Sequence, residues 1–172
     1  MVIKEITGRR SIRAYLDNPV EPEKLERVLE AARLAPSAKN RQDWRLVIVA
    51  DHDLKKDLIN AATPHQGFMH EAPIIIAACA TNPDYIMRCG QAAYPIDLAI
   101  VLDHLSLQAV AEGLGTCWIG SFDEEPVKMI LGIPQAVKVV ELMTLGYPAF
   151  NHEPAARKKL SDLTMTNRWQ EK

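Results

Sequence analysis

The stretch PIDLAIVLDHLSLQAVAE, residues 95–112, does more than any other part of the sequence to decide the fold. Four of its polar residues share one narrow helical stripe: Asp97, His104, Gln108 and Glu112. Nearly every other position is apolar, with Asp103 and Ser106 as the exceptions. A helix that is apolar on most sides must be enclosed on most sides. We therefore expect residues 95–112 to form a central helix around which the rest of the chain packs.

On both sides of this helix the sequence alternates between helix and strand patterns. Pro22 suits the first turn of a helix that ends before Pro36, and Asp51 is the expected N-cap of a further helix through Leu54, Leu58 and Ile59. A short helix is expected at 125–131. Strands are expected at 46–50, 74–81, 116–120 and 137–147. The connections between these segments are too irregular to predict a regular parallel order.

Length and charge exclude several classes of protein. A chain of 172 residues is expected to form a single domain, residues 1–172, and to bury about 70% of its unfolded surface. A net charge of −2 argues against a nucleic-acid coat or a polybasic membrane binder, so any phosphate binding must be local. The longest apolar run, 74–80, is too short to span a bilayer. We expect a soluble, cytoplasmic protein.

The cysteines and histidines do not indicate a metal centre. Cys79, Cys89 and Cys117 are widely spaced and odd in number, which fits reduced thiols rather than a disulfide framework or a zinc site. Cys79 is expected in the core, and the reactivity of Cys89 and Cys117 stays open. The histidines lack partners at ligand spacing, and there is no nucleophile elbow of a serine hydrolase.

Two basic clusters lie near opposite ends of the chain, Arg9-Arg10-Ser11-Ile12-Arg13 and Arg157-Lys158-Lys159. Most charge clusters are simply solvated. However, a phosphate dianion favours several guanidinium donors together with a hydroxyl, and the first cluster offers both. The spacing from Arg9 to Arg13 predicts that the two share one face of a short helix. The glycine-rich stretch 113–120 lacks the residues of a nucleotide-binding loop, and it is expected to end the central helix and begin a buried strand.

Four segments taken together resemble the FMN-dependent nitroreductases: Arg9–Arg13, Ala35–Trp44, Gly113–Gly120 and Arg157–Leu160. Each is weak alone, and their order and spacing over nearly the whole chain make the combination specific. Gln42-Asp43-Trp44 and Arg157-Lys158-Lys159-Leu160 depart slightly from the family's usual Gln-Pro-Trp and Arg-Lys-Pro-Leu.

The resemblance implies an α+β fold: a nitroreductase-like sandwich with a central, mostly antiparallel sheet flanked by helices. It also implies an intertwined homodimer with two identical FMN sites at the interface. A central helix that is apolar on most sides agrees with this arrangement, because such a helix can face its own core and a partner chain at once.

The resemblance further implies which residues bind the cofactor: Arg9, Arg10, Ser11, Arg13, Pro36, Ser37, Ala38, Asn40, Trp118, Ile119, Gly120 and Arg157. In this assignment Arg9, Ser11 and Arg157 hold the FMN phosphate, and Arg13 reaches the pyrimidine edge of the flavin. The loop 36–40 is presented to the flavin of the partner chain, while the backbone of 118–120 lies against the ring.

The activity implied is a ping-pong hydride transfer from NADH or NADPH, through FMN, to an electron-poor acceptor such as a nitroaromatic or a quinone. The cofactor carries this chemistry, so no catalytic side chain is assigned. A non-catalytic FMN storage or sensor module is the alternative, and a protein that binds another phosphate is a third. The sequence decides neither the donor nor the acceptor, although segments 64–71 and 82–94 are the expected walls of the acceptor pocket.

Overall fold

A single antiparallel sheet of four strands forms the centre of the computed structural model, which describes residues 1–150 and 152–171. Its strands are β1 (Trp44–Val49), β2 (Ile74–Ala80), β3 (Gly115–Ile119) and β4 (Lys138–Gly146). They lie in the order β1-β2-β4-β3, and each neighbouring pair is antiparallel. The predicted α+β class with an antiparallel sheet is confirmed.

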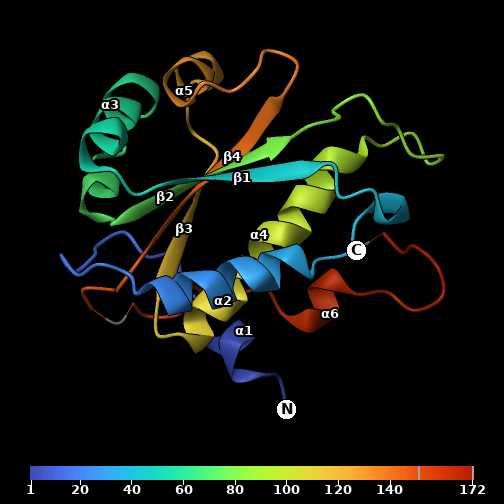
Figure 1. The fold of residues 1–172 in the computed structure, drawn as a ribbon. Coiled ribbons are helices and arrows are strands. Elements are labelled where there is room, and N and C mark those ends of the chain that lie inside the picture. Colours follow the sequence, from blue (N-terminus) through green and yellow to red (C-terminus); the bar gives the residue numbers. More distant parts are fainter. Residues whose placement is uncertain (151, 172) are drawn as a thin grey trace.

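Helices cover both faces of this sheet (Figure 1). On one face lie α2 (Pro22–Arg33) and α4 (Ala93–Ala111), and on the other lie α3 (His52–Ala62) and α5 (Glu124–Leu131). The remaining helical elements are short: α1 (Lys4–Gly8), α6 (Leu160–Leu163) and the 3-10 turns η1 (Ala38–Asn40) and η2 (Gly67–Glu71). Among the described residues, none of the helices combines the length and apolarity needed to cross a membrane.

Strand β2 is buried along its whole length because both of its faces are covered. Ile74, Ile76, Ala78 and Ala80 join the core beneath α2 and α4, whereas Ile75, Ala77 and Cys79 join the core beneath α3 and α5. Successive side chains of a strand point to opposite faces, so a continuous apolar run is what a strand between two helix layers requires.

The central helix α4 is present as predicted, with one apolar face left open. Eight of its residues are buried, yet Ile96, Ala99, Ile100 and Leu107 remain exposed or half-buried on one side of the helix. These positions recur at helical spacing and form one stripe, which the exposed Asp103 interrupts between Ile100 and Leu107. The enclosure expected from the sequence is therefore incomplete within one chain.

Two polar contacts fix helix ends, one at the end of α4 and one at the start of α3. Arg27 of α2 donates two 2.8 Å hydrogen bonds to the carboxylate of Glu112, and this contact lowers the pKa of Glu112 to about 2. Asp51 accepts a 2.8 Å hydrogen bond from the backbone N–H of Leu54, which confirms it as the N-cap of α3.

The short helix predicted for residues 9–13 is not observed. Helix α1 ends at Gly8, and the following residues are extended beside β3, where Ser11 pairs with Thr116 in parallel. The backbone N–H of Ile12 donates to the carbonyl of Thr116 at 2.9 Å. Strand β3 lies at the edge of the sheet, and its unpaired backbone groups offer the segment hydrogen bonds that outweigh helix continuation. The Ile12 side chain lies over Gly115, whose missing side chain leaves the room.

Tyr15 fastens this segment to the sheet. Its buried hydroxyl donates to the carbonyl of Ile12 at 2.9 Å and shares a 2.6 Å hydrogen bond with the hydroxyl of Thr144 on β4. Its backbone N–H donates to the carboxylate of Glu71 at 3.0 Å. Burial raises the pKa of Tyr15, which keeps the phenol protonated and the hydrogen bonds intact.

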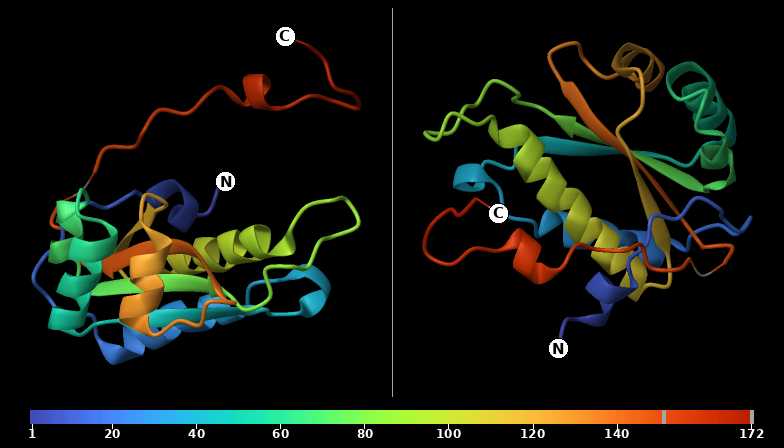
Figure 2. Two further views of the ribbon diagram at one scale, coloured as in Figure 1. Left: turned by 90° about the horizontal axis from the view of Figure 1, so that it is seen from above. Right: turned by 180° about the vertical axis from the view of Figure 1, so that it is seen from behind.

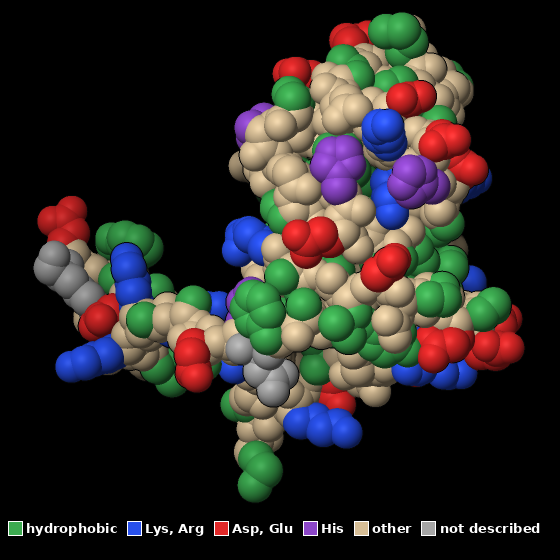
Figure 3. Space-filling view, turned by 90° about the vertical axis from the view of Figure 1, so that its left-hand side faces the viewer, with side chains coloured by type: hydrophobic (Ala, Val, Ile, Leu, Met, Phe, Trp, Pro, Cys, Tyr) green, Lys and Arg blue, Asp and Glu red, His purple; other side chains and the backbone are tan. Residues whose placement is uncertain are grey.

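Beyond β4 the chain leaves the body of the molecule as a long arm (Figure 2, left panel, and Figure 3). We call residues 152–171 the tail. It carries large apolar side chains that are mostly exposed, among them Leu160, Leu163 and Trp169, the last 83% exposed.

The Tyr15 contacts generate a stability prediction. Tyr15→Phe leaves the Thr144 hydroxyl and the Ile12 carbonyl buried without this partner, so we expect a loss of about 1–2 kcal/mol in the free energy of unfolding. Urea denaturation measures it. Tyr94→Phe is the control, because no described residue hydrogen-bonds to the Tyr94 hydroxyl. Equal unfolding free energies for the two variants would contradict the fastening role.

Candidate functional site

Residues from the two ends of the chain line one cavity of about 730 Å³. Arg9, Arg10, Ser11 and Arg13 contribute from the extended segment, and Arg157 contributes from the tail. The structure thus brings together five of the predicted cofactor-binding residues, including cations that are far apart in the sequence.

The cavity is strongly cationic. Within residues 1–150 and 152–171, neither Arg9 nor Arg13 forms an ion pair, and Glu153 is the single carboxylate among the residues that line the cavity. Arg157 is exposed and donates to the carbonyls of Ala155 and Ala156 at 3.1 and 3.2 Å. Guanidinium groups without carboxylate partners beside a hydroxyl are the donor set that binds a phosphate dianion.

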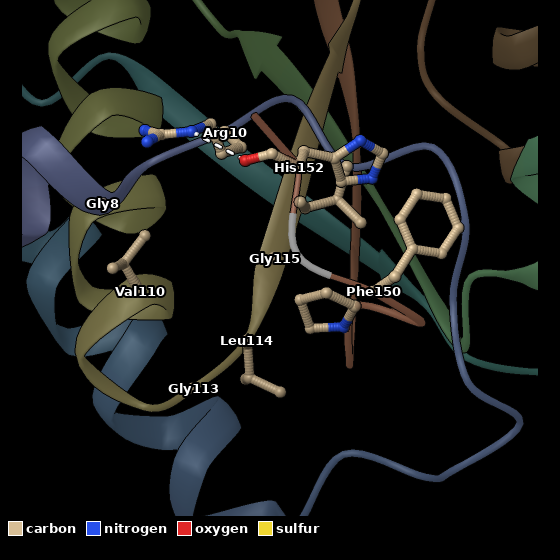
Figure 4. A pocket seen from close by; sticks show the side chains of 10 residues that line it. Gly8, Arg10, Val110, Gly113, Leu114, Gly115, Phe150 and His152 are labelled. Carbon is tan, nitrogen blue, oxygen red and sulfur yellow. Dashed lines mark hydrogen bonds between the residues drawn. The ribbon is translucent and has the colours of Figure 1, made fainter. Parts of the chain in front are cut away.

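Arg10 ties the extended segment to the tail. Its Nε donates to the carbonyl of His152 at 3.2 Å, and its Nη1 donates to the carbonyls of Thr7 and Arg9 at 2.8 Å each. Figure 4 shows this contact in a smaller neighbouring cavity of about 330 Å³, which is lined also by Gly113, Leu114 and Gly115. Arg10 therefore holds the cavity wall together and has fewer donors left for an anion than Arg9.

We call the cavity of about 730 Å³ the arginine cavity. Strand β3 leads away from it toward the other predicted contact residues. Ser11 pairs with Thr116. Gly120 lies four residues after Thr116, which is about 13 Å along a strand. Trp118 is half-buried and Ile119 is buried. The residues 118–120 do not line the arginine cavity, so the structure places them further along the same strand rather than around the same anion.

The loop 36–40 lies at a different place on the molecule, and none of its residues lines the arginine cavity (Figures 1 and 2). Asp97 of α4 accepts a 3.0 Å hydrogen bond from the backbone N–H of Ala38, and the Ser37 hydroxyl accepts one from Gln42. Pro36, Ser37, Ala38 and Asn40 are thus not brought to Arg9 within one chain. The resemblance had assigned them to the flavin of a partner chain, and that assignment stays a prediction.

This loop has an unusual backbone. Lys39, Asn40 and Gln42 all have left-handed φ values, between 52° and 54°, which cost free energy for residues other than glycine. Such conformations persist only where the surroundings hold them, and here Asp97 supplies one support. From the sequence, Asp97 is predicted only as part of the polar stripe of the central helix. Its hydrogen bond to the loop is visible only in the structure.

The segment 82–94 packs onto the same loop. The Tyr85 ring lies 4.7 Å from the Arg41 guanidinium and 5.7 Å from the Lys39 ammonium. Asn82 donates to the carboxylate of Asp43 at 3.2 Å. Neither this segment nor 64–71 lines the arginine cavity, so their role as walls of an acceptor pocket stays a prediction.

Two of the three thiols are poor nucleophiles. Cys79 and Cys117 are buried, and burial raises the pKa of both, that of Cys79 to about 11. The charges of Arg13 and Arg9 oppose this rise at Cys117 without cancelling it. Cys89 is exposed.

Comparisons with known proteins give one consistent result. The model of the Nitroreductase family matches residues 6–65 and 55–147. A putative NADH dehydrogenase/NAD(P)H nitroreductase of Archaeoglobus fulgidus is 34% identical over 155 residues, covering 85% of this chain and 84% of that protein. An FMN reductase (NAD(P)H) of Bacillus subtilis is 31% identical, covering 86% and 66%. A crystal structure of a nitroreductase family protein from Clostridium difficile is similar with a TM-score of 0.87 at 29% identity, covering 98% and 100%.

Proposed function

Because the chain belongs to the nitroreductase family, we propose that it is an FMN-dependent NAD(P)H oxidoreductase whose phosphate site is the arginine cavity between residues 9–13 and the tail. The family and the fold are those predicted from the sequence. The meeting of Arg9 and Arg157 at one cavity is the observation that carries the site assignment.

The residues of the cavity fit the phosphate of FMN. Arg9 has no ion pair with another described residue, and the Ser11 hydroxyl lines the same space. Charge-assisted hydrogen bonds to phosphate are about twice as strong as neutral ones, and bidentate guanidinium groups fix its orientation. Arg9, Ser11 and Arg157 would hold the phosphate, while Arg10 keeps the segment and the tail together.

The remaining predicted residues would position the ring. Bound FMN supplies the capacity to accept and deliver hydride. Arg13 contributes a fixed cation that stabilises the negative charge of the reduced cofactor, and the backbone of Trp118, Ile119 and Gly120 gives the ring a flat surface with N–H donors. The residues of this chain therefore bind, orient and tune, and we assign no side-chain acid or base.

We propose that two chains form a homodimer that completes each site. The open apolar stripe on α4, the exposed apolar tail and the distant loop 36–40 all support this arrangement. In a dimer the α4 stripe becomes interface, the tail covers its partner, and the loop 36–40 reaches the cofactor of the other chain. The whole chain then acts as one FMN-binding domain.

The acceptor we propose is a small electron-poor molecule, such as a nitroaromatic or a quinone, reduced in a ping-pong cycle after NADH or NADPH has left. A non-catalytic store or sensor of FMN is the alternative, and it predicts a flavin that the nicotinamide donors do not reduce.

Cofactor affinity tests the phosphate site. Arg9→Gln and Arg157→Gln each remove a charge-assisted hydrogen bond, so we expect the Kd for FMN to rise about 10- to 100-fold. Quenching of FMN fluorescence on binding measures the Kd. Arg33→Gln loses the same charge on the outer side of α2, where Arg33 pairs with Glu30, and it should leave the Kd unchanged. An equal effect of all three variants would contradict the assignment.

Anaerobic reduction tests the activity. Purified holoprotein should be yellow, and NADH or NADPH should bleach the oxidised flavin band at about 450 nm, with recovery when a quinone or nitroaromatic is added. A flavin that stays oxidised with both donors contradicts NAD(P)H-linked catalysis and favours the storage module.

Sedimentation velocity tests the dimer. Wild-type holoprotein should sediment as a dimer with one FMN per chain, and Ile96→Glu should weaken the dimer by placing a charge on the open α4 stripe. Met129→Glu introduces the same charge at an exposed apolar residue of α5, on the other side of the sheet, and should leave the dimer intact. Monomeric wild-type holoprotein would contradict the shared site.

A further inference from the structure

Glu141 lies directly beside Gly120. Ile119 of β3 pairs with Leu142 of β4, so the next residues along the two antiparallel strands, Gly120 and Glu141, are neighbours. A Cβ atom built on Gly120 would lie 3.6 and 3.7 Å from the two carboxylate oxygens of Glu141. The carboxylate therefore stands beside the backbone that we assign to the flavin ring.

Strand alternation puts this carboxylate on the α4 side of the sheet. Trp118 and Met143, two residues from Gly120 and Glu141 respectively, both pack into the core beneath α2 and α4. Residues two apart on a strand share a face. Glu141 thus lies on the same face as the open apolar stripe of α4, where the proposed dimer would enclose the cofactor.

Glu141 has no partner of its own. Within the described residues its half-buried carboxylate makes neither a hydrogen bond nor an ion pair, whereas Glu124 binds Lys128 and Lys138. Burial alone raises the pKa of Glu141. An unpaired carboxylate at such a place costs stability, so packing does not explain its presence.

The charged and titratable groups around Glu141 come from each neighbouring element. On β3 the Cys117 thiol feels the charges of Glu141, Arg9 and Arg13 together. On β4 the Lys138 ammonium is bound to Glu124, and on β2 the opposite residue is the apolar Ala78. Tyr94 at the start of α4 packs on the same core. Among the groups named here, Glu141 is the carboxylate without an ion pair to a described residue.

We propose that Glu141 tunes the bound cofactor by taking up one proton from solvent when the FMN gains an electron pair. This inference rests on the proposed function. The cofactor gains two electrons and one proton and becomes an anion, and the carboxylate gains one proton and becomes a neutral acid. Reoxidation by the acceptor reverses both changes, so charge balances over the cycle.

The sign of the pH dependence follows from the charges. The extra negative charge of the reduced cofactor raises the pKa of Glu141 further, so between its two pKa values reduction consumes one additional proton. Each pH unit in that window then makes reduction a further tenfold less favourable, which is about 30 mV for a two-electron couple. Above the window the wild-type cofactor is harder to reduce than one beside a neutral residue.

Redox titration of the holoprotein with reference dyes, between about pH 5 and pH 9, tests this. Glu141→Gln removes the charge at nearly constant shape, and its cofactor should be at least tenfold easier to reduce at about pH 8, or ~30 mV higher in potential. The two proteins should converge at the acid end, where wild-type Glu141 is protonated. Glu23→Gln, on the exposed side of α2, is the matched control and should follow wild type.

Potentials that run parallel for wild type and Glu141→Gln over the whole range would overturn the inference and leave the proposed function standing. A protein that binds no FMN would overturn the proposed function itself. If Glu141→Gln fails to hold FMN, the ratio of Kd values for oxidised and reduced FMN in wild type gives the same information by linkage. That ratio must change about tenfold per pH unit within the window beyond the change in free FMN, and a constant ratio contradicts the proposal.

Discussion

The pairing of an N-terminal segment with the edge of the sheet is the contact on which the candidate site depends. The backbone N–H of Ile12 donates to the carbonyl of Thr116, and the Ile12 side chain packs over Gly115. The Tyr15 hydroxyl adds a hydrogen bond to the Thr144 hydroxyl on β4. Without this pairing, the arginines of residues 9–13 would lie on the short surface helix that the sequence predicts. With it they face the tail that follows β4, and two cationic segments from opposite ends of the chain share one cavity.

The two helix layers bear on where the proposed cofactor surface lies. Strand β2 is covered on both faces, and the cofactor site that we propose lies instead along the edge strand β3 and on the open side of α4. The arginine cavity lies at one end of β3, and Gly120 with Glu141 lies at the other. In our proposal the phosphate site and the ring surface lie about 13 Å apart along this strand, and a second chain closes the ring surface.

The parts of the fold that the sequence predicts well are those set by local interactions. Helix α2 begins at Pro22, Asp51 caps α3, and the central helix differs from its predicted range by two residues or fewer at each end. The helix predicted for residues 9–13 was wrong, because pairing with an edge strand more than 100 residues away decides their conformation. The meeting of Arg9 and Arg157 came from the family resemblance, since no local pattern joins the two ends of a chain.

Other features of the site need strand register or backbone geometry, which a single sequence does not contain. Glu141 looked like an ordinary polar residue of a predicted strand, and only its pairing opposite Gly120 gives it a place in the proposed site. The left-handed backbone at Lys39 and Asn40 has no glycine to signal it.

A crystal structure of the FMN complex tests the central claim most directly. The account predicts the FMN phosphate within hydrogen-bonding distance of Arg9, Ser11 and Arg157, with the ring beside Gly120 along β3. A phosphate bound elsewhere, with Arg9 and Arg157 on separate surfaces, would contradict it.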